Sequence, residues 1–144
     1  MSNTGSCLCG AVHYEISAPI TDTGACHCDM CRKWSGGVYL GVEVAADNMM
    51  ISGSENVTTF TSSEWAERGF CKTCGSSIYN RITSPGAHHG SYHVSMGTLD
   101  QTDGIALKGE VFIDQKPKGY SFAEETEQLT GAELMALFAP PESP

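Results

Sequence analysis

The stretch "FCKTCGSSIY", residues 70–79, carries the strongest structural signal in the chain. Two residues separate Cys71 from Cys74, a spacing that lets both sulfur atoms face one ion across a tight turn, as in many zinc sites. Gly75 follows, and glycine readily adopts the positive φ that such a turn often needs. Two thiolates supply half of a tetrahedral ligand set, so the other half must come from elsewhere in the chain.

A second cysteine pair lies near the N-terminus, in "CLCG" at residues 7–10. Cys7 and Cys9 have a shorter spacer than the usual two to four residues, but the glycine that follows gives the segment a similar shape. Combined with Cys71 and Cys74, this pair makes a four-cysteine set. The sequence therefore predicts a closed structural zinc site that ties the N-terminus to the middle of the chain.

The remaining cysteines, Cys26, Cys28 and Cys31, lie together in "ACHCDMCRKWSGG", residues 25–37. Three protein ligands with one open position are the pattern of a catalytic zinc, where water or substrate completes the coordination. Two alternatives stay open. His27 or a distant histidine could close the site, although a side chain inside a C-x-C should point away. The three cysteines could also join one of the pairs.

Seven cysteines, an odd number, do not suit a disulfide framework. Disulfides are also rare in a reducing cytosol, which is the expected location because the N-terminus lacks the features of a signal peptide. Metal binding is the better interpretation. Zinc is preferred for thiolate-rich sites, with iron–sulfur as a minor competitor.

Length and charge narrow the classes of partner. The chain has 144 residues, which suits one domain, expected over residues 1–139 with a disordered tail at 140–144. The net charge is −9, and the eight lysines and arginines are scattered, so a nucleic-acid partner is not expected. No apolar run approaches the ~20 residues needed to span a bilayer, so no membrane role is expected.

The periodicity of apolar residues predicts a mainly β fold. Alternating or β-rich segments, separated by turn residues, are expected to be strands at 11–16, 38–44, 57–60, 77–80, 92–96 and 110–114. Residues 29–34 could form one helical turn after the cysteine cluster. A short C-terminal helix is predicted because Thr130 and Glu133 have capping-box spacing and Pro140 follows the apolar run.

Four motifs occur in order: "GSCLCGAVHYE" (5–15), "CHCDMCRKWSGG" (26–37), "FCKTCGSSIY" (70–79) and "VSMGTLD" (94–100). Together they closely resemble the glutathione-dependent formaldehyde-activating enzyme family, which includes centromere protein V, over roughly residues 5–122. Four ordered motifs are far more specific than a single C-x-x-C.

The resemblance implies a small, tent-like β-sheet fold and two zinc ions per chain. One structural zinc would be held by Cys7, Cys9, Cys71 and Cys74. A second, catalytic and labile zinc would be held by Cys26, Cys28 and Cys31. The implied activity joins glutathione to formaldehyde, which is a carbon–sulfur lyase reaction in reverse. The chain departs from the family pattern at Glu110–Val111, where relatives often have His-Ile, and at Gly119, where they often have Trp.

Charge favours a thiol as the substrate. A divalent ion with three thiolates has a net charge of −1 (+2 − 3), so it should acidify bound water less than a three-histidine site does. A thiol suits the open position better, because its thiolate stays nucleophilic while bound. Glutathione also needs a local cation on this acidic chain, and Arg32 and Lys33 are the nearest candidates to bind it.

Three competing interpretations remain. The chain could be a non-enzymatic zinc protein, acting as a glutathione carrier or interaction module, because thiols add to formaldehyde without a catalyst. A zinc hydrolase is disfavoured by the charge argument. A cytidine-type deaminase needs H-x-E and a later P-C-x-x-C. His13 and Glu15 match the first half formally, but Phe70 precedes Cys71 where the second half requires proline.

Overall fold

The computed structural model describes residues 3–138, which divide into two compact units. The first unit comprises the described residues up to Thr23 together with Leu40–Ala106, and the second comprises Gly24–Tyr39 and the described residues from Leu107 onward. Strands dominate, and the helices are short, so the prediction of a mainly β fold with a short C-terminal helix is confirmed. The tail predicted at residues 140–144 lies outside the described residues, and the single domain over 1–139 stays a prediction.

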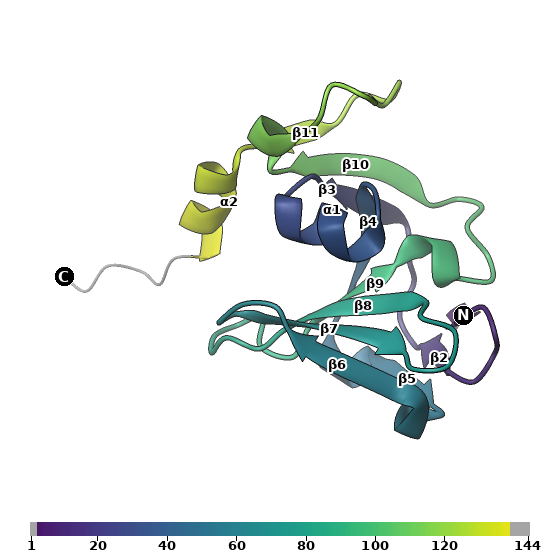
Figure 1. Ribbon diagram of the computed structural model, residues 1–144. Coiled ribbons are helices and arrows are strands. Elements are labelled where there is room, and N and C mark those ends of the chain that lie inside the picture. The colour runs from purple at the N-terminus through teal and green to yellow at the C-terminus, as the bar shows by residue number, and fades with distance from the viewer. Residues whose placement is uncertain (1–2, 139–144) are drawn as a thin grey trace. The chain divides into compact units, whose positions relative to one another are not determined.

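Figure 1 shows the elements along the chain. The strands are β1 (Asn3–Ser6), β2 (His13–Ile16), β3 (Asp22–Cys26), β4 (Tyr39–Val44), β5 (Met49–Ser52), β6 (Val57–Thr61), β7 (Ala66–Cys71), β8 (Ser77–Ile82), β9 (Tyr92–Ser95), β10 (Ala106–Val111) and β11 (Glu127–Leu129). The helices are α1 (Asp29–Ser35) and α2 (Gly131–Phe138), and 3-10 turns cover Ala46–Asn48, Ser54–Asn56, Met96–Thr98 and Ile113–Gln115.

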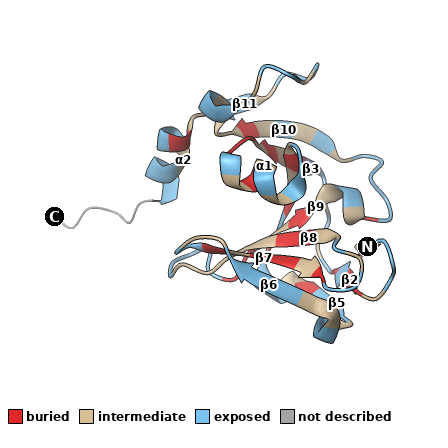
Figure 2. Ribbon diagram, in the orientation of Figure 1, coloured by how far each residue is buried: buried red, intermediate tan, exposed pale blue. Residues whose placement is uncertain are grey.

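Antiparallel strands build the first unit. One sheet has the order β1-β2-β5, and the strands β4, β9, β8, β7 and β6 follow one another in a second sheet. In Figure 2 buried positions lie on β7, β8 and β9, whereas β6 is exposed after its first residue, Val57. A single apolar core joins the two sheets, with Val12, Ile16, Ile78 and Val94 fully buried.

The core of the first unit also contains Cys7 and Cys71, which are 3% and 0% exposed. Cys7 lies just after β1, and Cys71 is the last residue of β7. Burial of these two sulfur atoms among apolar side chains places one cysteine of each pair inside the core. The ends of β1 and β7 therefore meet at a cysteine cluster.

The second unit contains β3, β10 and β11, in the order β11-β10-β3, together with both α-helices. β10 and β11 are parallel, with Glu110 opposite Gln128. Two residues, His27 and Cys28, separate the end of β3 from the start of α1, so Cys26 and Cys28 lie on either side of His27 in the strand-to-helix turn. In α2, the Thr130 hydroxyl accepts from the Glu133 amide and the Glu133 carboxylate accepts from the Thr130 amide, which forms the predicted capping box.

The strand predicted at 110–114 ends earlier than expected. β10 stops at Val111 because Phe112 has a φ of 56°, a left-handed conformation that no other described non-glycine residue adopts. The next residues, Ile113–Gln115, form a 3-10 turn. The alternation of apolar residues continued past the point where the backbone changes direction, so periodicity alone misplaced the end of the strand.

Candidate metal centres

The four-cysteine cluster lies in the first unit. Cys7 and Cys9 come from the connection between β1 and β2, and Cys71 and Cys74 come from the turn between β7 and β8. Their four sulfur atoms all lie within 4.8 Å of one another. The sequence prediction that these two separated pairs come together agrees with the structure.

Local hydrogen bonds shape both cysteine turns. The amide of Gly10 donates to the Cys7 carbonyl at 3.2 Å, and the amide of Gly75 donates to the Cys71 carbonyl at 2.8 Å. Gly10 and Gly75 have φ values of 82° and 79°, as expected for glycines that close such turns. The prediction of a positive φ at Gly75 therefore agrees with the structure.

Donors also point at the sulfur atoms. The amides of Val12 and Thr73 donate to the sulfurs of Cys7 and Cys71 at 3.3 and 3.4 Å. The Ser76 hydroxyl lies 3.2 Å from the sulfur of Cys74. Hydrogen bonds from this hydroxyl and from the Ser76 amide lower the pKa of Cys74 to about 5. This environment favours the thiolate, which is the form that binds metal.

The three-cysteine cluster lies in the second unit, at the strand-to-helix turn. Cys26 is the last residue of β3, Cys28 is the N-cap of α1, and Cys31 lies in the first turn of that helix. The Cys31 amide donates to the Cys28 sulfur at 3.3 Å, which is the N-cap hydrogen bond of α1. Among residues 3–138, no other Cys, His, Asp or Glu ligand atom joins this group.

The spacing of the sulfur atoms suits zinc. Four thiolates about 2.3 Å from a tetrahedral ion lie roughly 3.8 Å apart. The distances are 3.6 Å between the sulfurs of Cys7 and Cys9 and 3.8 Å between those of Cys9 and Cys71. In the second cluster, 3.4 Å separates the sulfurs of Cys26 and Cys28. A disulfide would need about 2.05 Å, and none of the seven cysteines forms one. Each cluster could hold a metal ion.

The charge balance of the three-cysteine cluster also favours a bound cation. Contact with the thiols of Cys28 and Cys31, together with burial, raises the pKa of Cys26 well above its ordinary value. Three thiols in contact cannot all ionise without a positive charge among them. A divalent ion supplies that charge, so these three cysteines suit a bound metal better than a site without one.

His27, which lies between two of these cysteines, is fully buried and points away from them. Its Nδ1 lies 2.7 Å from the Tyr120 hydroxyl, and its Nε2 lies 2.8 Å from the Glu110 carboxylate. Both ring nitrogens are therefore occupied, so His27 does not close the three-cysteine set. The cysteines of the two pairs gather with one another into one group, and Cys26, Cys28 and Cys31 gather into another.

The predicted substrate-binding cations flank this cluster on α1. Arg32 is partly buried, and its Nε donates to the His27 carbonyl at 2.9 Å, whereas Lys33 is exposed. The partly buried Met30, Trp34 and Phe112 pack against the buried group of Cys28, Cys31 and Tyr39. The Trp34 ring also lies 5.6 Å from the ring of Tyr39. Trp34 is thus both a packing residue and a neighbour of the cluster.

Sequence reasoning missed three residues around His27. The sequence marks Glu110 only as a departure from the family pattern, and neither Tyr120 nor Thr126 belongs to a predicted site. The available signal was a glutamate within a segment predicted to be a strand. In the structure this glutamate is buried, and carboxylates are rarely buried without partners. Nothing in the sequence indicated that its partner would be a histidine 83 residues away.

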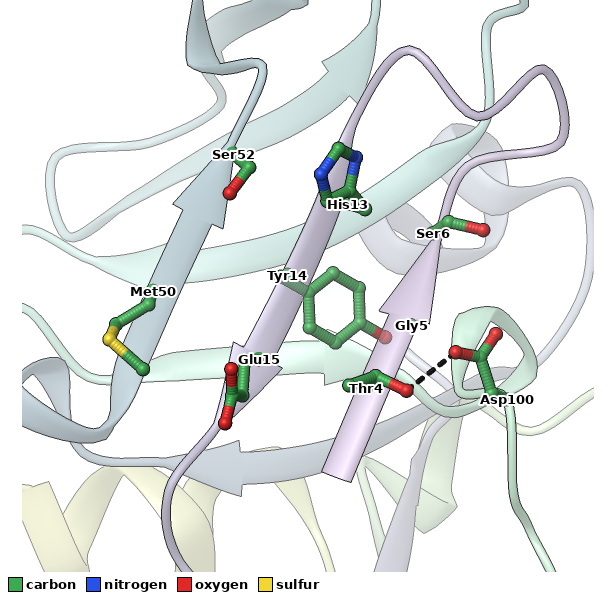
Figure 3. Close-up of a pocket in the computed structure, with 9 residues that line it drawn as sticks. All are labelled: Thr4, Gly5, Ser6, His13, Tyr14, Glu15, Met50, Ser52 and Asp100. Carbon is green, nitrogen blue, oxygen red and sulfur yellow. Dashed lines mark hydrogen bonds between the residues drawn. The ribbon is translucent and has the colours of Figure 1, made fainter. Parts of the chain in front are cut away.

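A pocket of about 390 Å³ lies on the three-stranded sheet of the first unit (Figure 3). It is lined by residues of β1, β2 and β5 together with Asp100, which accepts a hydrogen bond from Thr4 at 2.6 Å. His13 and Glu15, the formal H-x-E match, lie here, and no cysteine is among the lining residues. The deaminase interpretation therefore lacks a metal ligand set beside its glutamate.

The fold and the sites define a mainly β protein with one complete four-cysteine cluster and one buried three-cysteine cluster. The family model described as "Glutathione-dependent formaldehyde-activating enzyme" matches residues 2–115, and the chain belongs to this family. It is 32% identical over 131 residues to an uncharacterized lyase of Schizosaccharomyces pombe, covering 91% of this chain and 93% of that protein. It is 30% identical over 83 residues to a putative glutathione-dependent formaldehyde-activating enzyme of Halomonas elongata, covering 52% of this chain and 53% of that protein.

The predicted family is therefore confirmed, and the names of these relatives support a lyase. None of the helices in residues 3–138 is long and apolar enough to cross a membrane.

Proposed function

We propose that the chain is a carbon–sulfur lyase that joins glutathione, or a similar small thiol, to formaldehyde or a related small aldehyde. The observation that carries the proposal is the three-cysteine cluster. Cys26, Cys28 and Cys31 supply three gathered ligands without a fourth among the described residues, in a chain of this family. In this proposal the four-cysteine cluster holds a structural zinc, and the three-cysteine cluster holds a labile zinc beside the reacting groups.

A zinc ion in the three-cysteine cluster would supply positive charge that keeps a substrate thiol ionised at neutral pH. The chain's own residues do the rest. Met30, Trp34 and Phe112 pack against the buried group that contains Cys28 and Cys31, and their apolar side chains would limit the access of water there. Arg32 and Lys33, on the helix that carries Cys31, would attract the carboxylates of glutathione. Addition to formaldehyde then depends mainly on holding thiol and aldehyde together.

The test measures exchange between free formaldehyde and S-hydroxymethylglutathione at equilibrium by NMR magnetisation transfer. The zinc-loaded protein should raise the exchange rate above the uncatalysed background, in proportion to protein concentration. A Cys28→Ser variant that keeps the wild-type circular dichroism spectrum should leave only the background. Exchange that stays at background with the zinc-loaded wild type would reject the enzyme.

Binding measurements test the recognition of substrate separately. Glutathione should bind better than S-methylglutathione, whose sulfur cannot ionise. Lys33→Gln should weaken binding of glutathione and leave binding of an uncharged thiol such as 2-mercaptoethanol unchanged, because only glutathione carries carboxylates. Equal loss for both thiols would argue against carboxylate recognition by Lys33.

A second candidate function is a non-enzymatic glutathione carrier or interaction module. It is favoured by the exposed apolar side chains of Phe60 and Trp65 in the first unit, which are 61% and 47% exposed and could contact another protein. Thiol-selective binding without any acceleration of exchange would support this candidate. Acceleration that disappears in Cys28→Ser would support the lyase.

A further inference from the structure

The turn between Cys26 and Cys28 is held at every polar group of His27. Its amide donates to the Val111 carbonyl at 3.1 Å, and its carbonyl accepts from the Arg32 Nε at 2.9 Å. Its two ring nitrogens contact Glu110 and Tyr120 at 2.8 and 2.7 Å. The residue itself is 0% exposed, so its own polar atoms depend on these partners and not on solvent. His27 therefore has very little freedom, in either backbone or side chain.

Glu110 anchors this arrangement from β10. It is 4% exposed, and its second carboxylate oxygen accepts from the Thr126 hydroxyl and from the Gln128 side-chain amide at 3.3 Å. Burial raises the pKa of Glu110, but hydrogen bonds from Thr126, His27 and Gln128 outweigh burial and place it below its ordinary value. The carboxylate is thus ionised and accepts three hydrogen bonds.

The partners on both sides fix the orientation of the imidazole. An ionised carboxylate only accepts hydrogen bonds, so His27 Nε2–H donates to Glu110 at 2.8 Å. On the other side of the ring, Nδ1 forms a hydrogen bond with the Tyr120 hydroxyl at 2.7 Å. Both ends of the ring are fixed, and the backbone on each side carries a cysteine.

We propose that Glu110 is a positioning residue for the three-cysteine cluster, acting through His27 to set the distance and direction of the Cys26 and Cys28 thiolates. The inference rests on the proposed role of this cluster as a metal site. Partners behind the ligands of a metal site usually orient them, and their loss commonly lowers metal affinity about 10–100-fold. Here the orienting contact is the one between Glu110 and His27, and it acts on Cys26 and Cys28 through the backbone of His27, which joins them.

A purely structural role explains the carboxylate poorly. A buried carboxylate seldom adds net stability compared with well-packed apolar residues, even when it is hydrogen-bonded. It does impose direction, because its hydrogen bonds form only in one geometry. Direction is what two ligands need when they are separated by a single residue and their sulfur atoms lie 3.4 Å apart.

The experiment measures metal binding and not turnover. The full chain, with zinc in the four-cysteine cluster, is titrated with Co²⁺, and the thiolate-to-cobalt absorption and the visible ligand-field bands are recorded. Competition with a chelator gives the affinity. Glu110→Ala leaves the His27 Nε2–H without an acceptor, so affinity should fall 10–100-fold and the ligand-field bands should shift. Glu110→Gln keeps an acceptor oxygen for Nε2–H and should stay within about 5-fold of the wild type.

Two tyrosine variants provide a matched pair. Tyr120→Phe removes the hydroxyl that reaches His27, and Tyr14→Phe removes a hydroxyl that lies 2.6 Å from Thr98 in the other unit. Each variant loses one short hydrogen bond of the same kind. Tyr120→Phe should lower cobalt affinity at least 5-fold, whereas Tyr14→Phe should leave it unchanged even when its melting temperature falls as far.

The proposal is overturned if folded Glu110→Ala binds Co²⁺ with wild-type affinity and spectrum, or if Tyr14→Phe loses as much affinity as Tyr120→Phe. If Glu110→Ala does not fold, Tyr120→Phe decides, and wild-type affinity in that variant rejects the proposal. Failure of the proposed lyase would look different. The wild type would bind cobalt and respond to these substitutions but would not accelerate exchange.

Discussion

Replacing Cys71 and replacing Cys28 by serine should have opposite consequences for folding. Cys71 is fully buried in the core of the first unit, and its sulfur lies 3.8 Å from that of Cys9. A serine hydroxyl does not ionise at neutral pH, so Cys71→Ser removes one ligand of four and buries a polar group in its place. Cys28 also caps α1, but its cluster ties together residues of a single turn.

The magnitude follows from the metal and the burial. Structural zinc contributes on the order of 10 kcal/mol to small domains, and a whole domain is stable by only about 5–15 kcal/mol. Burying an unpaired hydroxyl costs roughly 1–3 kcal/mol more. Cys71→Ser should therefore remove most of the free energy of unfolding. Cys28→Ser keeps an N-cap side chain on α1, since serine is a good cap, and should cost about 1 kcal/mol or less besides its labile metal.

Thermal unfolding by circular dichroism, with zinc content measured on the same samples, separates the two outcomes. Cys71→Ser should be unfolded or melt far below the wild type, whereas Cys28→Ser should melt within a few degrees of it and lack only the labile ion. The reasoning is refuted if Cys71→Ser melts like the wild type, or if Cys28→Ser is the unfolded variant. The second result would mean that the structural and labile clusters are exchanged.

Three further predictions concern metal, packing and pH. Protein purified without chelator should carry up to two zinc ions per chain, and a mild chelator should remove one while the fold persists; a maximum of one after reconstitution would contradict the two clusters. A Cβ on Gly131 would lie 2.6 Å from the Phe112 ring, so Gly131→Ala should lower the unfolding free energy by about 1–3 kcal/mol and weaken cobalt binding, measured by denaturation and titration. Burial lowers the pKa of His93, so the folded state favours its neutral form. Its contribution to stability is therefore present above pH ~6.5 and lost as the pH falls below it, and His93→Gln should lose less melting temperature than the wild type between pH 7.5 and 5.5; equal losses would exclude His93.

The turns that carry the cysteines were predictable because their geometry is local. A C-x-x-C followed by glycine specifies its own turn, and Gly75 adopts the expected conformation. Spacing also predicted how the seven cysteines are grouped. The pairs Cys7/Cys9 and Cys71/Cys74 each supply half of a tetrahedral ligand set, so each pair needs the other, whereas the remaining three cysteines lie together in one segment. The strands with clear alternation, such as β2 and β4, were found for the same reason, because period and burial agree there.

The rest depended on contacts that spacing does not encode. β7 was missed because Glu67 and Arg68 interrupt its apolar pattern, although Arg68 is only 3% exposed in the folded chain. The position of His27 inside a C-x-C predicted that its side chain points away from the cysteines, but no sequence pattern identified Glu110 and Tyr120 as its partners. These contacts form when β10 and the segment after it pack against the turn that carries His27, and no local pattern predicts that packing.

The two clusters also differ in how far along the chain they reach, and this has a consequence for the order of assembly. Cys26 and Cys31 are five positions apart, whereas 62 positions separate Cys9 from Cys71. Closing the longer loop costs about 2 kcal/mol more chain entropy. During synthesis Cys31 is added before Cys71, so the three cysteines of the local cluster are all present before the four-cysteine set is complete. The four-cysteine cluster can bind its ion only after Cys71 and Cys74 have been added and have reached Cys7 and Cys9, so the supply of metal late in synthesis becomes part of the folding pathway.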